Sequence, residues 1–329
     1  MAAGLRGKPV AQALVAWMIW SCRQSTDPQG VGLQGTSNMT ARLTILASGS
    51  AGNSALVECD GERWLIDIGL EPKELDARMR IVDAEWSQIR GVLLTHRHSD
   101  HWTPKSLSRC WTSRVPVFCH RDHVPTFRLG CPDFQDIERE RLFRPFVGER
   151  PIAISADWKC RPFRVRHDGG ATFGFRFESS DSAFAYAADL GCWDNGLLER
   201  LLDVELLALE FNHDPELLQQ SRRPPWLVRR ILGDEGHLSN AQACELVGEV
   251  LKQSGTDRLR QLVLLHISRE CNSSDLAATT ARAALAEFGS EANVFAAEQQ
   301  EPSPWFVIGE SLTDANIERP ARLVQAALF

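Results

Sequence analysis

The sequence predicts a single α/β domain in which two β-sheets are covered by helices. Three strand-like segments come first, within residues 41–69, and short strands then alternate with helices up to residue 289. No internal repeat and no long low-complexity linker divides this part of the chain. Strands followed by a mixture of strands and helices fit one such domain better than two independent ones. A chain of 329 residues that is 43% hydrophobic can bury the core that the domain needs.

The first three strands are expected to form a meander. ARLTILA (41–47) and SALVEC (54–59) are short apolar segments joined by SGSAGN. Asp60-Gly61 is a tight-turn pair that leads into RWLIDIG (63–69).

Later segments are predicted from periodicity. Further strands are expected at 161–167, 172–180, 183–190, 204–212 and 259–268. Residues 239–253 have helical periodicity, and Ser239 with Gln242 forms a capping box at their start. Residues 274–289 predict a second helix, which ends at Gly289.

The two ends of the chain are expected to lie outside the domain. Residues 1–38 contain a short apolar run (11–20) and then a stretch rich in Gly, Ser, Pro and Gln. The run is too short to span a bilayer and no clear small-residue cleavage site follows it, so a disordered extension or an upstream start codon is favoured over an export signal. The domain is therefore expected at 39–310, with residues 311–329 as a C-terminal tail.

Cysteine usage and net charge narrow the class of protein. Nine cysteines, an odd number without a CxxC pair, do not form the pattern of a disulfide framework or of a thiolate zinc site. Reduced thiols in a cytoplasmic protein are the simpler interpretation. The net charge of −7 argues against a broadly basic surface for nucleic acid, but it leaves room for a local basic groove. No membrane contact is expected, and the oligomeric state is not predicted.

The segment GVLLTHRHSDHW (91–102) predicts a metal site. Its first five residues are apolar, as in a strand covered on both faces, and they carry His96 to the carboxyl end of that strand. His96 and His98 are two residues apart, so their rings project to the same side of an extended chain. Asp100 and His101 follow on a turn, where they can face a second ion. Nitrogen and oxygen ligands without thiolate suit Zn²⁺, Mn²⁺ or Fe²⁺, whereas a polar loop with coincidental histidines is disfavoured.

This HxHxDH pattern resembles the signature of the metallo-β-lactamase superfamily, and the resemblance extends over nearly all of residues 41–310. It implies a four-layer αββα sandwich with a dinuclear metal site. The family's later ligands have candidates in the same chain order at predicted strand ends: His167 in RVRHDGG, Asp189 in AYAADLG and His266 in VLLHIS. Asp67 in LIDIG matches the family's early aspartate, which supports the histidine ligands.

The resemblance implies three ligands for each of two divalent ions and one bridging carboxylate. The first ion would be bound by His96, His98 and His167. The second would be bound by Asp100, His101 and His266. The bridge would be Asp189. Seven ligands for two ions leave positions open for a hydroxide and a substrate, which is the catalytic rather than the structural arrangement.

The segment between the last two ligands bears on which bond is cut. EFNHD (210–214) and GHLSN (236–240) resemble the YycJ/WalJ branch of the superfamily, as does SGSAGNS (48–54). Glu210 and His237 are also similar to a glutamate and histidine that ribonuclease Z-like phosphodiesterases use beside their metals. An imidazole held by a carboxylate can protonate a departing alkoxide, so His237 is expected to be the general acid and Glu210 its orienting group. In the structural alternative, His237 belongs only to the cap of the following helix.

We therefore expect a metal-dependent phosphodiester hydrolase with Asp100, Glu210 and His237 as its catalytic residues. The resemblance implies a DNA exonuclease of the YycJ/WalJ type that works in the 5′-to-3′ direction. Two other reactions stay open, namely hydrolysis of a small cyclic phosphodiester, as in PhnP-like enzymes, and thioester hydrolysis of the glyoxalase II kind. A non-catalytic metal-binding module is a further alternative, which the intact ligands disfavour.

Candidate substrate contacts come from three segments. They are Asn53, Ser54, Asn212, His213, Arg222, Arg223 and Trp226. Arginines around a tryptophan in SRRPPWLVRR (221–230) can bind phosphates and stack a base. A solvated helix face is an equal alternative for Arg229 and Arg230. Cys119, His120 and His123 resemble part of an accessory zinc site, but the spacing is incomplete and a structural or surface role is favoured.

Overall fold

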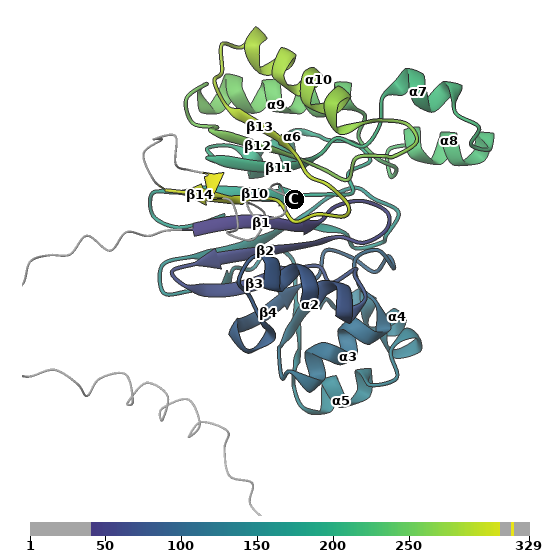
Figure 1. The fold of residues 1–329 in the computed structure, drawn as a ribbon, viewed down its shortest axis with the longest axis vertical. Helices are drawn as coiled ribbons and strands as arrows, with labels where there is room; N and C mark the ends of the chain where they lie inside the picture. The colour runs from purple at the N-terminus through teal and green to yellow at the C-terminus, as the bar shows by residue number, and fades with distance from the viewer. Residues whose placement is uncertain (1–40, 310–316, 319–329) are drawn as a thin grey trace, which may run out of the picture. The chain divides into compact units, whose positions relative to one another are not determined.

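The structure is a computed structural model that describes residues 41–309 and 317–318. Two β-sheets lie face to face, and helices cover the outer face of each (Figure 1). The first sheet has the order β15 (Ile317–Glu318), β14 (Trp305–Ile308), β1 (Ala41–Ala47), β2 (Ser54–Cys59), β3 (Glu62–Ile66), β4 (Ile89–Leu93), β5 (Val117–His120) and β6 (Phe143–Phe146). The second has the order β13 (Asn293–Ala296), β12 (Gln261–Leu265), β11 (Leu206–Glu210), β10 (Ala183–Ala187), β9 (Phe173–Glu178), β8 (Lys159–Arg164) and β7 (Ile152–Ala153).

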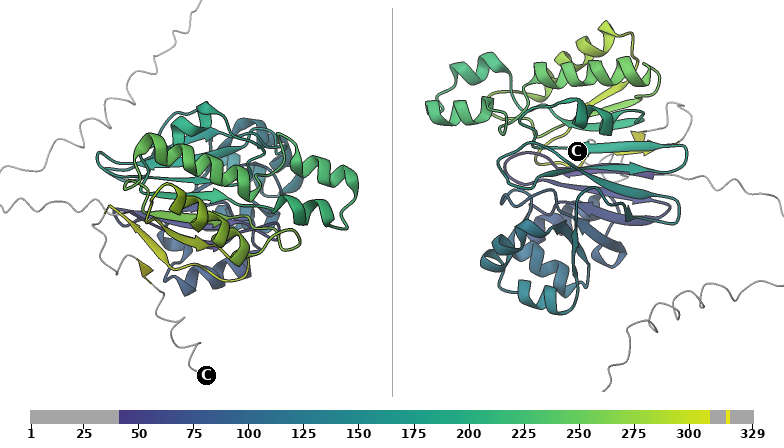
Figure 2. Two further views of the ribbon diagram at one scale, coloured as in Figure 1. Left: turned by 90° about the horizontal axis from the view of Figure 1, so that it is seen from above. Right: turned by 180° about the vertical axis from the view of Figure 1, so that it is seen from behind.

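The helices are divided between the two outer faces. Over the first sheet lie α2 (Pro72–Ile81), α3 (Pro104–Thr112), α4 (Val124–Gly130) and α5 (Phe134–Arg139), with the short 3₁₀ helices η2 (Trp86–Gln88) and η3 (Arg121–His123). Over the second sheet lie α6 (Asn195–Leu201), α9 (Asn240–Ser254) and α10 (Ser274–Glu287). A further pair, α7 (Pro215–Gln220) and α8 (Pro225–Leu232), stands out from the sandwich in all the ribbon views (Figures 1 and 2).

Central strands are buried on both faces, which explains their nearly continuous apolar sequences. In β1, Leu43 and Ile45 pack between the two sheets, whereas Leu46 packs against the helices. In β12, Val263 packs between the sheets and Leu264 against the helices. Successive side chains of a strand point to opposite faces, so one strand contributes to two layers of core. The predicted fold class is confirmed.

Several predicted bounds are confirmed and others are corrected. The strands at 41–47 and 54–59 have the predicted limits, and the capping box of Ser239 and Gln242 opens α9. The predicted strands 63–69 and 259–268 were too long, because β3 ends at Ile66 and β12 at Leu265.

Most residues at the two chain ends lie outside the described part of the structure, so the predictions for them stay predictions. Residues 1–38 lie outside the described residues, as does most of the predicted tail. Two residues of that tail, 317 and 318, form β15, which pairs with β14. Within the described segments, no helix has both the length and the apolar character needed to cross a membrane.

Candidate metal centre

The predicted site residues follow strands whose carboxyl ends meet. β3 runs parallel to β4, and β10, β11 and β12 run parallel to one another. Carboxyl ends of parallel strands lie at the same edge of a sheet, which is where open α/β sheets place their sites. The residues brought there are Asp67 after β3, His96 after β4, His167 after β8, Asp189 after β10, Glu210 at the end of β11 and His266 after β12.

Three of these residues have left-handed backbone angles. The φ angle is 59° at Asp67, 56° at Asp189 and 53° at His266. Few residues other than glycine adopt this conformation, which ends a strand and turns the chain sharply. β3 and β12 therefore stop immediately before Asp67 and His266, which is why the predicted strands 63–69 and 259–268 were too long.

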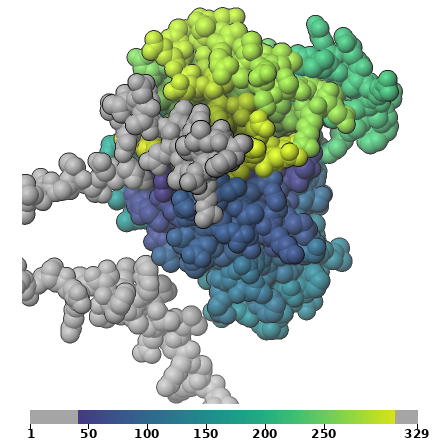
Figure 3. Space-filling model, in the orientation of Figure 1, coloured from purple at the N-terminus to yellow at the C-terminus, as the bar shows by residue number. Residues whose placement is uncertain are grey.

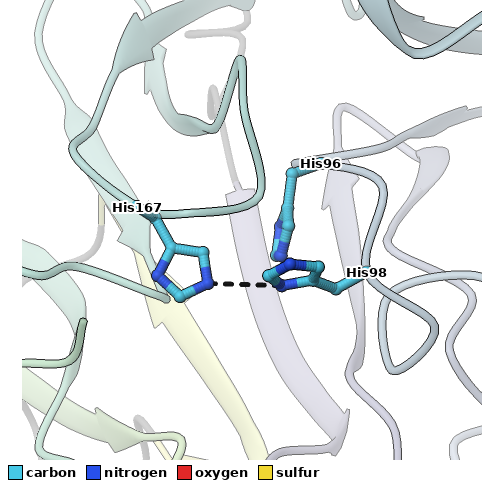
Figure 4. Close-up of side chains that lie close together, drawn as sticks. All are labelled: His96, His98 and His167. Atoms are coloured by element: carbon cyan, nitrogen blue, oxygen red, sulfur yellow. Dashed lines mark hydrogen bonds between the residues drawn. The ribbon is translucent and has the colours of Figure 1, made fainter. Parts of the chain in front are cut away.

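His96, His98 and His167 form the first group of potential ligands (Figure 4). One ring nitrogen of each lies within 4.8 Å of the others, and His98 Nδ1 is 3.3 Å from His167 Nε2. His167 Nδ1 is 2.9 Å from the carbonyl oxygen of Gly236, to which it can donate, so Nε2 is left with its lone pair toward the cluster. Burial, together with the neighbouring His101, lowers the pKa of His96 well below its usual range, so this ring is neutral and can bind a cation.

Asp100, His101 and His266 form a second group, and Asp189 lies beside it. Asp100 Oδ2 is 3.5 Å from His101 Nε2 and 3.5 Å from His266 Nε2. Asp189 reaches both histidines as well, with Oδ2 2.8 Å from His101 Nε2 and Oδ1 3.6 Å from His266 Nε2. Burial raises the pKa of Asp189, but His266 and His101 outweigh it and hold that pKa well below its usual range. Asp189 also groups with His96, so it lies between the two sets of ligands.

The donor set fits divalent cations. His96 Nε2 and His266 Nε2 are buried, and neither has a hydrogen-bond partner among the described residues. Buried polar atoms are normally paired, so unpaired ring nitrogens that face carboxylates fit a cation between them. Histidine and aspartate without cysteine are ligands that Zn²⁺, Mn²⁺ and Fe²⁺ accept. Together with the family identified below, the cluster supports the binding of divalent metal.

Asp67 holds His101 from behind. Its Oδ2 is 2.7 Å from His101 Nδ1, and its Oδ1 accepts a 2.8 Å hydrogen bond from the backbone N–H of Thr95. Burial alone would lower the pKa of His101, but Asp67 and the two site aspartates raise it well above its usual range. A carboxylate on the far ring nitrogen fixes the tautomer and orientation of a metal-binding histidine, so Asp67 occupies the position expected of a supporting residue.

Glu210 joins two of the site histidines. Its Oε1 is 2.7 Å from His237 Nδ1 and 3.2 Å from His266 Nδ1, while its Oε2 accepts a 2.7 Å hydrogen bond from the backbone N–H of Leu190. Burial raises the pKa of Glu210, but His237 outweighs it and the pKa falls to about 2. His237 Nδ1 is 3.5 Å from Asp189 Oδ1, so the pair lies directly beside the potential metal ligands.

Two supporting residues were missed by the sequence analysis. Thr95 donates its backbone N–H to Asp67, and its hydroxyl lies 3.0 Å from both His96 Nδ1 and His101 Nδ1. Asp168 Oδ1 is 3.6 Å from His98 Nε2, and the other oxygen of Asp168 pairs with Arg230. Both residues adjoin a predicted ligand in the sequence, but only the folded chain shows which partner each one reaches.

The predicted substrate residues are spread over different surroundings. Asn53 reaches the cluster, with Nδ2 3.2 Å from Asp100 Oδ2, whereas the Ser54 hydroxyl donates to the backbone of Asp67. Asn212 donates a 2.8 Å hydrogen bond to the carbonyl oxygen of His266. His213 is buried, and its pKa falls to about 4 through burial.

Other candidates lie outside the cluster. The turn between α7 and α8 contains Arg222 and Arg223, and α8 contains Trp226. None of the three belongs to the groups of potential metal ligands. Cys119 is buried under the helices of the first sheet, whereas His120 on the same strand stacks on Phe173. His123 Nε2 lies 2.8 Å from the carbonyl oxygen of Ala171. The rings of His120 and His123 lie 6.4 Å apart, but the three residues do not form one of the groups of potential metal ligands among the described residues, and their structural role stays a prediction.

Comparison with known proteins places this site in a family. Residues 62–267, more than half of the chain, match the family described as "Beta-lactamase superfamily domain". The chain belongs to the metallo-β-lactamase superfamily. Among solved structures, the metallo-β-lactamase fold protein YhfI from Bacillus subtilis aligns with a TM-score of 0.57 at 13% identity, covering 80% of this chain and 98% of that one. That likeness confirms the fold.

Two relatives in sequence align with about three quarters of this chain. The exodeoxyribonuclease YycJ of Bacillus anthracis is 28% identical over 252 residues, 76% of this chain and 91% of that protein. The exodeoxyribonuclease WalJ of Streptococcus pneumoniae is 26% identical over 251 residues, 74% of this chain and 88% of that protein. With the superfamily match and the ligand cluster, these relatives identify the protein as a metal-dependent hydrolase.

Proposed function

We propose that the protein hydrolyses phosphodiester bonds in DNA as a 5′-to-3′ exonuclease. The observation that carries the proposal is the 2.7 Å contact between His237 and Glu210, beside Asp189. Phosphodiester cleavage releases an alkoxide that needs a proton, and a carboxylate-held imidazole at the reaction site can supply it. The DNA substrate and the direction of cleavage rest on likeness to the YycJ/WalJ branch, whose two relatives are named exodeoxyribonucleases.

Two divalent ions, Zn²⁺, Mn²⁺ or Fe²⁺, would occupy the cluster. The first would be held by His96, His98 and His167. The second would be held by Asp100, His101 and His266. The residue between them would be Asp189. When bound, such ions supply a nucleophilic hydroxide and positive charge for the phosphate oxygens.

The protein's own residues hold the imidazole that would protonate the leaving oxygen. With Nδ1 of His237 held by Glu210, Nε2 is the ring atom left to protonate the leaving oxygen. Glu210 also contacts His266, so one buried carboxylate fixes the general acid relative to a metal ligand. Asn53 contacts the second group of potential ligands, because its Nδ2 lies 3.2 Å from Asp100 Oδ2 and 3.1 Å from His101 Nε2.

The test combines metal analysis with three substrates assayed in parallel. Metal per chain is measured in purified protein, and hydrolysis is followed with bis(p-nitrophenyl) phosphate, 5′-phosphorylated duplex DNA and an acyl-glutathione thioester. We expect both phosphodiesters to be hydrolysed and the thioester to resist. Asp189→Ala should lower metal content and both activities, the latter by on the order of 10³-fold, whereas the exposed control Asp257→Ala should not.

Two results would contradict the proposal. Turnover of the thioester alone, lost in Asp189→Ala, would show a thioesterase. Hydrolysis of nucleotide-sized diesters with no effect of DNA length would show a small-molecule phosphodiesterase. DNA labelled at either end tests direction, because a 5′-directed enzyme releases a 5′ label as a short product at the first cleavage.

A further inference from the structure

The segment 215–232, here called the arm, consists of α7, α8 and the turn between them. It projects from the sandwich, and the space-filling view shows it as a lobe beside the second sheet and its helices (Figure 3). A small apolar cluster attaches it, in which Leu218 and Ile231 pack against Cys271. The arm is connected directly to the site, because it lies in the chain between Glu210 and His237.

The arm is basic in a chain whose net charge is −7. It carries four arginines and one acidic residue, Glu216. Arg222 and Arg229 are exposed, and neither has an ion pair within the part of the chain that the structure describes. Exposed guanidinium groups without internal partners favour an anionic ligand.

An aromatic ring is exposed on the same arm. Trp226 is 61% exposed, more than any other large apolar residue of the described chain except Leu129. It lies between the two pairs of arginines in the sequence. Exposed tryptophan next to arginine is the combination that binds unpaired nucleotides, since every base can stack on the ring while its phosphates meet the guanidinium groups.

The arm adjoins the metal centre at two points, near the end of α8 and at the turn between its two helices. Arg230 pairs with Asp168, whose Oδ1 is 3.6 Å from His98 Nε2. Arg223 Nη2 is 3.5 Å from the hydroxyl of Ser268, two residues beyond His266. The arm therefore contacts the rim of the site next to one ligand of each metal group.

A hollow lies at the turn of the arm. Its volume is about 750 Å³, and its lining consists of Ser221, Arg222, Arg223, Pro224, Leu227 and Glu270. A volume of this size can hold a nucleotide. The hollow lies between the turn of the arm and the loop that follows His266.

We propose that the arm binds an unpaired stretch of the polynucleotide beside the metal centre. Phosphates contact Arg222 and Arg229, and one base stacks on Trp226. The inference rests on the proposed nuclease function. It predicts that the arm promotes hydrolysis of a polymer but not of a diester too small to reach the arm. A second copy of the chain would be an alternative occupant, and the test separates the two outcomes.

Binding is measured with the full-length protein in EDTA, so that hydrolysis does not interfere. The probe is a 20-nucleotide single strand with a 3′ fluorophore, followed by anisotropy at several salt concentrations. Trp226→Ala should weaken binding about tenfold, the loss expected for one stacked base. Arg222→Ala with Arg229→Ala should reduce the slope of log K against log salt by about 1.4, or about 0.7 for each phosphate that an arginine no longer neutralises.

Matched controls remove the same groups elsewhere. Arg144→Ala with Arg150→Ala removes two exposed arginines on β6 and the following loop, and Leu129→Ala removes an exposed apolar side chain on α4. With metal restored, the ratio of DNA hydrolysis to bis(p-nitrophenyl) phosphate hydrolysis should fall at least tenfold in the arm variants and stay constant in the controls.

Each negative outcome has a distinct meaning. Arm variants that bind the strand as the controls do would overturn the inference. A halved mass in solution for Trp226→Ala would assign the arm to an interface between copies, which also overturns it. If the wild type hydrolyses neither diester, the proposed function fails, and the binding measurement in EDTA still decides whether the arm holds a strand.

Discussion

The ligand cluster and the arm adjoin one another, but they are built in opposite ways. In the cluster, His101 and Glu210 are fully buried and are held by hydrogen bonds from several strand ends. On the arm, Arg222 and Trp226 are exposed, and the packing that attaches the arm is limited to a small cluster around Leu218.

The two regions differ because hydrolysis and polymer binding require different kinds of surface. Hydrolysis requires groups fixed to within a fraction of an ångström, and strand ends with buried supporting residues provide that. Binding a polymer of varied sequence requires charge and an aromatic surface, which tolerate looser placement. Changes in the cluster should therefore affect every substrate, whereas changes on the arm should affect only long ones.

The largest effect is expected for His237→Ala, and it should depend on the leaving group. DNA hydrolysis should fall on the order of 10³-fold because the alkoxide then departs without a proton. Hydrolysis of bis(p-nitrophenyl) phosphate should fall less than tenfold, since p-nitrophenolate leaves readily unprotonated. Rates for both substrates and metal per chain are to be measured. Equal losses for both substrates with a lowered Tm would instead assign His237 to the helix cap.

A smaller effect is expected for Asp67→Asn, which weakens the support of His101. Loss of a carboxylate behind a metal-binding histidine typically lowers metal affinity 10–100-fold. Competition with a chelator measures that affinity, and the metal-induced rise in Tm should shrink in parallel. Asp83→Asn is the matched control, because Asp83 also has a left-handed φ angle, 54°, but is exposed and outside the cluster. Equal metal affinity in both variants would show that Asp67 does not support the metal centre.

The sequence predicted the cluster better than it predicted the arm, for physical reasons. The HRHSDH motif and the apolar strand before it are local, and later strands carry their candidate ligands at recognisable ends. Which of these ends meet depends on the strand order β12-β11-β10, which no local pattern encodes. Asp168 and Thr95 were missed for the same reason, since their partners are fixed by packing across distant segments.

The limits of strands and helices were likewise predicted only where the signal in the sequence is local. β1 was predicted from a short apolar segment bounded by a turn sequence, and the start of α9 from a capping box; both signals are local. The ends of β3 and β12 were not predicted, because no local pattern indicated the left-handed angles of Asp67 and His266 that follow these strands. The paired helices of the arm were not predicted, although α8 was expected to be helical at Arg229 and Arg230. The arginines and the tryptophan of this segment indicated a ligand, but they did not indicate that the segment folds into two helices.

The smallest effect is expected in stability, where the two regions can be compared through a pair of tryptophans. Trp158 is 1% exposed and packs between the sheets, so Trp158→Ala should lower the free energy of unfolding by about 3–5 kcal/mol. Trp226→Ala should change it by less than about 0.5 kcal/mol, because a side chain that is 61% exposed loses little apolar burial. Urea denaturation of both variants measures the difference. A loss of several kcal/mol in Trp226→Ala would mean that the ring stabilises the folded chain, and weakened DNA binding in that variant would then reflect a disturbed arm rather than the absence of a stacked base.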